Sequence, residues 1–176
     1  MVENNVRLGF LDVFVFDNES IRGGFLVTNL ETVPFEFMVT EEITPNKLQK
    51  LLYGKALVRY SFVHLIALPL IQASKENLSA VIVKKDILLN LRHHLQIPVI
   101  ALSGEDTPLN LPGGEKIPAE TIRPISFNFD RKFPSDDRFI KTVLTPLLRS
   151  VDLYEPFDRL DTAIRAAQAK NLKLER

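Results

Sequence analysis

The sequence predicts a single α/β domain, assigned to residues 1–176, with a mixed sheet of five or six strands and helices on its faces. Three observations support this fold class. Three apolar segments near the N-terminus are joined by short polar turns, which is typical of an antiparallel three-strand meander. A later strand, short helix and strand have the spacing of a parallel βαβ unit. Two helical segments near the C-terminus are expected to complete the cover of the sheet.

The meander is predicted over residues 8–17, 21–28 and 35–43. The first two segments are rich in β-branched and aromatic residues, and the third alternates so that one of its faces is wetter. Gly23 and Gly24 interrupt the second segment, which indicates a bulge or the close approach of another part of the chain.

A long helical run is predicted next. Thr44 is a good N-cap and Pro45 suits the first helical position, so the helix is expected to begin there and to continue toward residue 74. Gly54 and Pro69 are expected to weaken, kink or break it. Its first half is amphipathic, whereas its second half is apolar nearly all round and is expected to be buried.

The rest of the chain carries the parallel unit and the C-terminal helices. Residues 103–124 contain four prolines and three glycines, which predicts a long Pro/Gly-rich surface loop. The other predicted elements, in chain order, are strand, helix, strand, strand, helix and helix over residues 78–84, 86–95, 97–102, 125–129, 136–150 and 155–169.

Composition excludes several kinds of chemistry and setting. The chain has no cysteine, which excludes disulfides, thiolate catalysis and cysteine-ligated metal. The most apolar stretch, residues 62–71, is shorter than the ~20 residues of a membrane helix and is interpreted as core. The N-terminus lacks the pattern of a secretory signal. A cytoplasmic protein without a membrane partner is therefore expected.

Charge is unevenly distributed along a chain whose net charge is zero. Residues 1–43 hold eight acids and two bases, whereas residues 44–75 hold five bases and no acid. One interpretation is that the bases neutralise the acids of the meander; the other is that they form a binding stripe for an anionic partner. Helical spacing allows one shared face for the four candidate binding residues, Lys47, Lys50, Lys55 and Arg59.

The order of three antiparallel strands, helix, strand, helix and strand over residues 8–102 resembles the ribonuclease H-like fold. Enzymes of that fold hold two metal ions with acids on the first strand, on the first helix and near the end of the fourth strand. Asp12 matches the first position and Asp86 is a candidate for the last, but the first helix has no acid. The resemblance therefore implies a nuclease with an incomplete or displaced acid set. The alternative is that Asp12 faces solvent from an edge or pairs with Arg22.

Other catalytic patterns are missing from the sequence. It contains no nucleophile elbow and no glycine-rich phosphate loop, so no cofactor is predicted. His64 lies in the apolar run and is expected in the core. His93 and His94 are adjacent on a short helix, where they diverge by ~100° and do not suit one metal, so no metal site is predicted.

These observations favour a non-catalytic cytoplasmic binding or accessory module rather than an enzyme. A protein partner is expected, because a nucleic-acid binder usually shows a basic excess that this chain lacks. A metal-dependent nuclease is the alternative. A third hypothesis is a small-ligand pocket at the C-terminal ends of the parallel strands, near Lys84, Lys85, Ser103 and Gly104.

Overall fold

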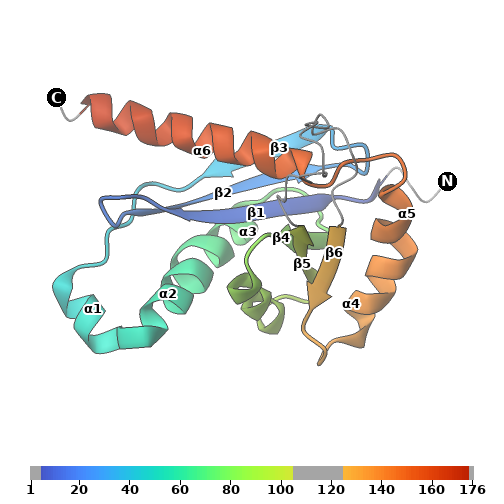
Figure 1. Ribbon diagram of the computed structural model, residues 1–176, viewed down its shortest axis with the longest axis horizontal. Coiled ribbons are helices and arrows are strands. Elements are labelled where there is room, and N and C mark those ends of the chain that lie inside the picture. The colour runs from blue at the N-terminus through green and yellow to red at the C-terminus, as the bar shows by residue number, and fades with distance from the viewer. Residues whose placement is uncertain (1–4, 105–124, 175–176) are drawn as a thin grey trace, which may run out of the picture.

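The computed structural model describes residues 5–104 and 125–174, and it confirms the predicted α/β fold class. Its centre is a mixed sheet with the strand order β3-β2-β1-β4-β5-β6 (Figure 1). The strands are β1 (Leu8–Val15), β2 (Ile21–Thr28), β3 (Pro34–Val39), β4 (Ala80–Val83), β5 (Val99–Gly104) and β6 (Ile125–Phe129).

Strand directions match the predicted arrangement. β1, β2 and β3 pair antiparallel, as expected for a meander with short turns. β4 lies parallel to both β1 and β5, and β6 closes the sheet antiparallel to β5. The connection between β4 and β5 is η4 (Asp86–His93), a 3₁₀ helix where the sequence predicted a short helix without specifying its type.

The long helical run is divided into five pieces. These are α1 (Lys47–Tyr53), η2 (Gly54–Ala56), α2 (Leu57–Tyr60), η3 (Ser61–Ala67) and α3 (Leu68–Ala73). The predicted break is present at Gly54, whose φ of 49° lies in the left-handed region. The wide π-helical turn of η3 leads directly into the segment with Pro69, which cannot supply a helical N–H.

The predicted helix start at Thr44 is wrong. Asn46 is the N-cap, because its side chain accepts a hydrogen bond from the Gln49 backbone N–H at 2.8 Å. The Gln49 side chain accepts in return from the Asn46 backbone N–H at 2.9 Å. This reciprocal capping box satisfies two N–H groups at once, which a threonine two residues earlier cannot do. Pro45 is buried just before the cap.

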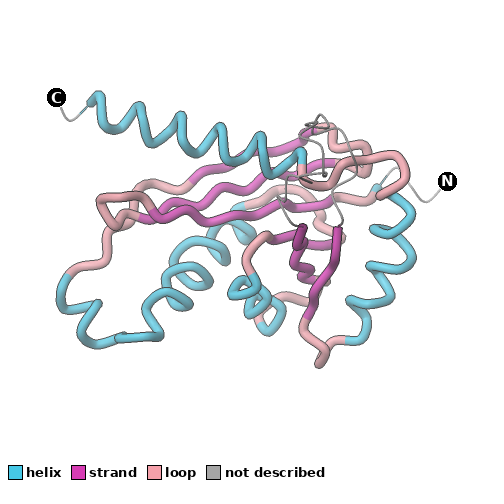
Figure 2. Tube along the Cα trace, viewed as in Figure 1, coloured by secondary structure: helices cyan, strands magenta, loops and turns pink. Residues whose placement is uncertain are grey.

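Two apolar cores lie on the two faces of the sheet, each covered by helices (Figure 2). η3, α3 and η4 cover one face. The opposite face is covered by α4 (Pro134–Phe139), η5 (Ile140–Leu144), α5 (Thr145–Leu147) and α6 (Glu155–Leu174), the two expected C-terminal helical segments. A Cβ atom at Gly23 would meet Ile66 at 2.1 Å, and one at Gly24 would meet Ile164 at 2.5 Å. The glycine pair thus permits the close approach that the sequence indicated.

Several element boundaries differ from the prediction. β3 ends at Val39, after which Ile43 forms only an isolated bridge with Ile21. β5 continues through Ser103 and Gly104, which pair with β6. The remainder of the predicted loop, residues 105–124, lies outside the described residues. By length and composition alone, the 27-residue run Lys47–Ala73 is sufficient to cross a membrane. Its second half instead packs in the core.

Candidate functional site

The helical segment of residues 47–60 protrudes from the sheet, and we call it the arm (Figure 1). α1 contributes no buried residue to the fold. Leu48, Leu51 and Leu52 are 62%, 79% and 72% exposed, and Val58 in α2 is 51% exposed. Single exposed apolar side chains are ordinary on protein surfaces, whereas a cluster on one projecting segment is a candidate interaction site. The first half of the helix was expected to be amphipathic. Its sequence does combine leucines with lysines, but the leucines do not face the core.

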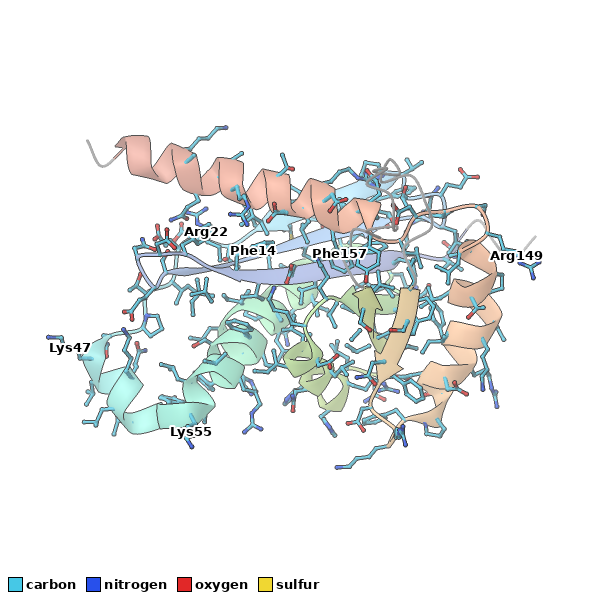
Figure 3. The ribbon with its side chains drawn as sticks, viewed as in Figure 1. Phe14, Arg22, Lys47, Lys55, Arg149 and Phe157 are labelled. Atoms are coloured by element: carbon cyan, nitrogen blue, oxygen red, sulfur yellow. The ribbon has the colours of Figure 1, made fainter. Side chains whose placement is uncertain are left out.

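All four predicted binding residues lie on the arm and are exposed. Figure 3 shows Lys47 and Lys55 pointing away from the body of the molecule. Lys50 forms an ion pair with Glu19, in the turn between β1 and β2. The remaining base is Arg59, in α2. The arm therefore combines exposed aliphatic side chains with positive charge.

One interpretation of the charge pattern was that these bases neutralise acids of the meander; among the described residues Lys50 does so with Glu19, whereas Glu36 and Glu42 have other partners. Glu36 accepts hydrogen bonds from the Ser74 hydroxyl and the Lys75 backbone N–H. Glu42 accepts from the side chains of Asn18 at 2.7 Å and Gln168 at 3.2 Å.

Hydrogen bonds to Glu42, led by one from Ser20 and followed by those from Asn18 and Gln168, lower the pKa of its carboxyl. Glu36 and Glu42 of the meander are thus hydrogen-bonded to residues outside the arm. Within residues 5–104 and 125–174, the ion pair from an arm base goes to Glu19 instead.

A row of aromatic rings connects the arm to the body. The ring centroids are 4.6 Å apart for Tyr53 and Tyr60, 5.2 Å for Tyr60 and His64, and 5.0 Å for His64 and His94. A hydrogen bond with Tyr60 raises the pKa of the Tyr53 hydroxyl. The prediction of a core position for His64 is wrong: its side chain is exposed, because the buried residues of η3 occupy the other helix faces. These ring contacts run from α1 through α2 and η3 to the residue after η4.

Asp12 is buried on the central strand β1, and its partner is Lys85 rather than Arg22. Asp12 Oδ1 also accepts the Val13 backbone N–H at 2.8 Å. Lys85 follows the end of β4, and its Nζ lies 5.1 Å from the centroid of the Phe14 ring. The predicted alternatives of a solvent-facing Asp12 or a pair with Arg22 are therefore both wrong.

The acid set of a metal-dependent nuclease is not assembled by the described residues. Asp86 is exposed at the start of η4. No three His, Asp or Glu side chains within residues 5–104 and 125–174 lie close enough to hold a metal ion. The carboxylate of Asp12 is instead paired with the ammonium group of Lys85, which supplies the positive charge that a metal ion would supply in a nuclease. In this arrangement the pair can hold the segment that follows β4 against the middle of β1.

The predicted small-ligand residues also have structural partners. Lys84 is exposed, with its Nζ 5.8 Å from the Phe157 ring centroid. The hydroxyl of Ser103 lies 2.7 Å from that of Ser126 on the neighbouring strand. A Cβ atom at Gly104 would lie 2.2 Å from the Tyr154 hydroxyl, so an aromatic side chain fills the space beside that glycine. A hollow among the described residues lies elsewhere, lined by Asn18, Arg22, Val39, Thr40, Glu41, Glu42 and Thr44.

The sequence interpretation missed a buried ion pair between Arg92 and Asp136. Arg92 Nε lies 3.1 and 2.9 Å from the two carboxylate oxygens of Asp136, and both side chains are almost fully buried. The backbone N–H of Val99 also donates to Asp136, at 3.3 Å. The pair joins η4, β5 and α4. An acid at the first turn of a predicted helix gave no signal that its partner lies 44 residues earlier.

No family model matches the chain, and no curated protein matches it. Two solved structures with a coarse likeness are complexes of endonuclease V from Ciona intestinalis. A variant bound to a 23mer DNA containing an inosine followed by a ribo-adenosine gives a TM-score of 0.41 at 14% identity, covering 65% of this chain and 52% of the other. The endonuclease V complex with a corresponding 24mer DNA gives 0.39 at 12% identity, covering 65% and 53%. The chain spans about half the length of these structures, and the likeness carries no argument about activity.

Proposed function

We propose that this chain is a binding module without catalysis of its own, which docks onto a partner protein through the arm of residues 47–60. One observation carries the proposal: α1 is an ordered helix with no buried side chain, and its leucines are exposed. Most helical stability in proteins comes from packing of an apolar face, so an unpacked apolar helix is a surface suited to a partner.

The leucines supply the attractive part of the proposed interface. Burying one leucine side chain contributes about 1.5–3 kcal/mol. Leu48, Leu51 and Leu52 together therefore offer several kcal/mol before the costs of association. Tyr53, which is 38% exposed, adds a ring that combines an apolar body with a hydroxyl, and such side chains are enriched at interfaces.

The bases supply orientation and choice of partner. Lys47, Lys55 and Arg59 are exposed on the same segment as the leucines, and this segment contains no acid. A partner with an apolar groove bordered by Asp and Glu side chains would complement this surface, in the manner of an amphipathic helix in a groove. Electrostatic complementarity of this kind accelerates encounter and excludes basic partners.

Nucleic acid is less well suited to the arm than a protein is. Single-stranded nucleic acids bind to rings that are free to stack, and double-stranded nucleic acids bind to dense positive charge. Leu51 and Leu52 of the arm are 79% and 72% exposed, and the rings of Tyr60 and His64 are engaged with each other. The zero net charge of the chain also gives no general attraction to phosphate.

The test is capture of binding proteins with matched variants. The chain is used as bait from a lysate of its native cell, with quantitative mass spectrometry of what is retained. The variant Leu48→Ser/Leu51→Ser/Leu52→Ser should lose a specific protein that wild type retains. Lys47→Glu/Lys55→Glu/Arg59→Glu should lose the same protein.

Two controls leave the arm intact. Arg149→Glu reverses an exposed charge at the far end of the molecule (Figure 3), and Val33→Ser removes an exposed apolar side chain away from the arm. Both should keep the captured protein, and purified partner should then bind directly. Equal capture by all variants would overturn the proposal. Arm-dependent binding to phosphatidylserine vesicles without a protein partner would replace it with a membrane-surface function.

A further inference from the structure

The free edge of β3 carries an apolar surface that the proposed function does not use. β3 is the border strand of the sheet, so one side of its backbone has no strand partner among the described residues. Phe35, Phe37 and Val39 are 49%, 46% and 36% exposed, and Val33 just before the strand is 48% exposed. An exposed apolar edge strand is a template for pairing with another strand.

The direction of the backbone groups follows from the register. Thr40 donates its N–H to the Gly23 carbonyl at 2.9 Å, so its hydrogen-bonding groups face β2. Successive residues of an antiparallel strand alternate in this direction. Val39 and Phe37 therefore direct their N–H and C=O groups toward the open edge. These are the two positions at which an added strand would form hydrogen bonds.

The side chains at the edge divide between the two faces of the sheet. Met38 packs against the core under η3 and α3. Phe37 and Val39 consequently lie on the opposite face, which is the face that α6 covers over β1 and β2. They extend that apolar face beyond the helix, and an added strand would continue it.

We infer that the edge of β3 pairs antiparallel with β3 of a second copy of this chain. A two-fold axis beside Met38 places Phe37 opposite Val39 of the second copy, twice. Aromatic and β-branched residues are favourable cross-strand neighbours. The same axis places Glu36 opposite Thr40 of the second copy, so no like charges meet. An axis beside Glu36 would instead set that carboxylate opposite its own copy.

A second observation supports the register with the two-fold axis beside Met38. The pairing of β2 with β3 is irregular between Val27 and Thr28, at the beginning of β3. The axis beside Met38 uses only the regular part of the strand. The net charge of zero adds no general repulsion between copies. Because the seam is short, the dimer should dissociate on dilution, as small interfaces do.

The first measurement is mass in solution by light scattering over a range of chain concentrations. Wild type should rise toward twice its 20.0 kDa mass as concentration increases. Phe37→Lys/Val39→Lys should remain monomeric, because it sets lysines against each other across the seam. Leu51→Lys, an equally polarising change on the arm, should dimerise as wild type does. Circular dichroism checks that each variant is folded.

A second measurement locates the axis. The chain has no cysteine, so Met38→Cys introduces a single thiol that would face its own copy across the seam, within disulfide reach. Air oxidation should give a covalent dimer of Met38→Cys and none of Leu51→Cys. Wild type that stays monomeric at every concentration, or cross-linking of Leu51→Cys alone, would overturn the inference. The dimer measurements do not involve the partner of the arm. The two proposals can therefore fail separately.

Discussion

The carboxylate of Asp12 on β1 is paired with the ammonium of Lys85, which follows the end of the parallel strand β4. Burial differs between the partners: the side chain of Asp12 is 5% exposed and that of Lys85 is 39% exposed. The carboxylate depends on the lysine for its charge partner, whereas the ammonium can reach water without the carboxylate. The two residues therefore differ in what their removal costs.

Removing the lysine should destabilise the fold more than removing the acid. Lys85→Met leaves a buried carboxylate with the Val13 N–H as its remaining described hydrogen-bond donor, which should cost about 2–3 kcal/mol of the free energy of unfolding. Asp12→Asn keeps a side-chain carbonyl for that N–H and frees Lys85 to the solvent, so it should cost about 1 kcal/mol. Urea denaturation of both variants at neutral pH measures the difference. Equal costs would show that burial does not set the energetics of this pair.

The nuclease alternative predicts an activity that the binding function does not. If Asp12 were catalytic, wild type would degrade nucleic acid with magnesium or manganese, and Asp12→Asn would abolish the cleavage while remaining folded. We expect neither protein to cleave, because Asp12 is bound to Lys85 and no acid cluster is formed by the described residues. The assay uses single- and double-stranded DNA and RNA. Cleavage that depends on Asp12 would replace the proposed function with the alternative.

The buried pair between Arg92 and Asp136 should be the most sensitive polar position in the fold. Asp136→Asn keeps the shape of the side chain but leaves the guanidinium of Arg92 with a neutral partner in a site that is almost closed to water. Breaking a buried pair of this kind costs about 3–5 kcal/mol. Thermal unfolding should show a far lower midpoint than for Asp137→Asn, an adjacent control whose side chain is more exposed. Similar midpoints would contradict this account.

Glu42 should make stability depend on pH in the acid range. Its pKa in the folded protein is lowered from the usual 4.5 by hydrogen bonds from Ser20, Asn18 and Gln168. A lowered folded pKa means that the ionised group stabilises the fold above its unfolded pKa. This contribution is lost as the pH falls through the folded pKa. Glu42→Gln should therefore be less stable than wild type at neutral pH, and the gap should narrow below pH 4.5. A gap that does not change with pH would remove this role.

Much of the fold could be predicted because its signals are local. The strands of the meander follow from β-branched and aromatic segments between polar turns, and the helix break follows from a single glycine, Gly54. Gly23 and Gly24 also indicated close approach before the helices that approach them were known. The helix start was misplaced because Thr44 and Asn46 are both good caps, and only the reciprocal bond with Gln49 separates them.

The candidate site was less predictable because it depends on apolar side chains of α1 that do not pack against the rest of the fold. The spacing of Leu48, Leu51 and Leu52 is that of a helix facing a core, and no pattern in the sequence states that the core is absent there. Exposure of the arm bases was predicted, but the pair of Lys50 with Glu19 joins residues 31 positions apart. His64 was assigned to the core from its neighbours, although a helix always turns some side chains outward.

Replacing Gly54 should destabilise the arm without destabilising the rest of the fold. Its φ of 49° and ψ of −128° suit glycine alone, and a Cβ atom there would meet nothing within 4 Å. Gly54→Ala is therefore a test of backbone strain without steric clash, and the strain should be on the order of 1–3 kcal/mol. Because α1 buries no side chain, the arm can relax while the two cores stay intact. Amide hydrogen exchange should quicken across residues 47–56 and stay unchanged in β1 and β4, with little change in the global midpoint of unfolding. A global loss of stability equal to the strain would show that the arm folds as one unit with the sheet, and that its exposed leucines belong to a more tightly coupled structure than we infer.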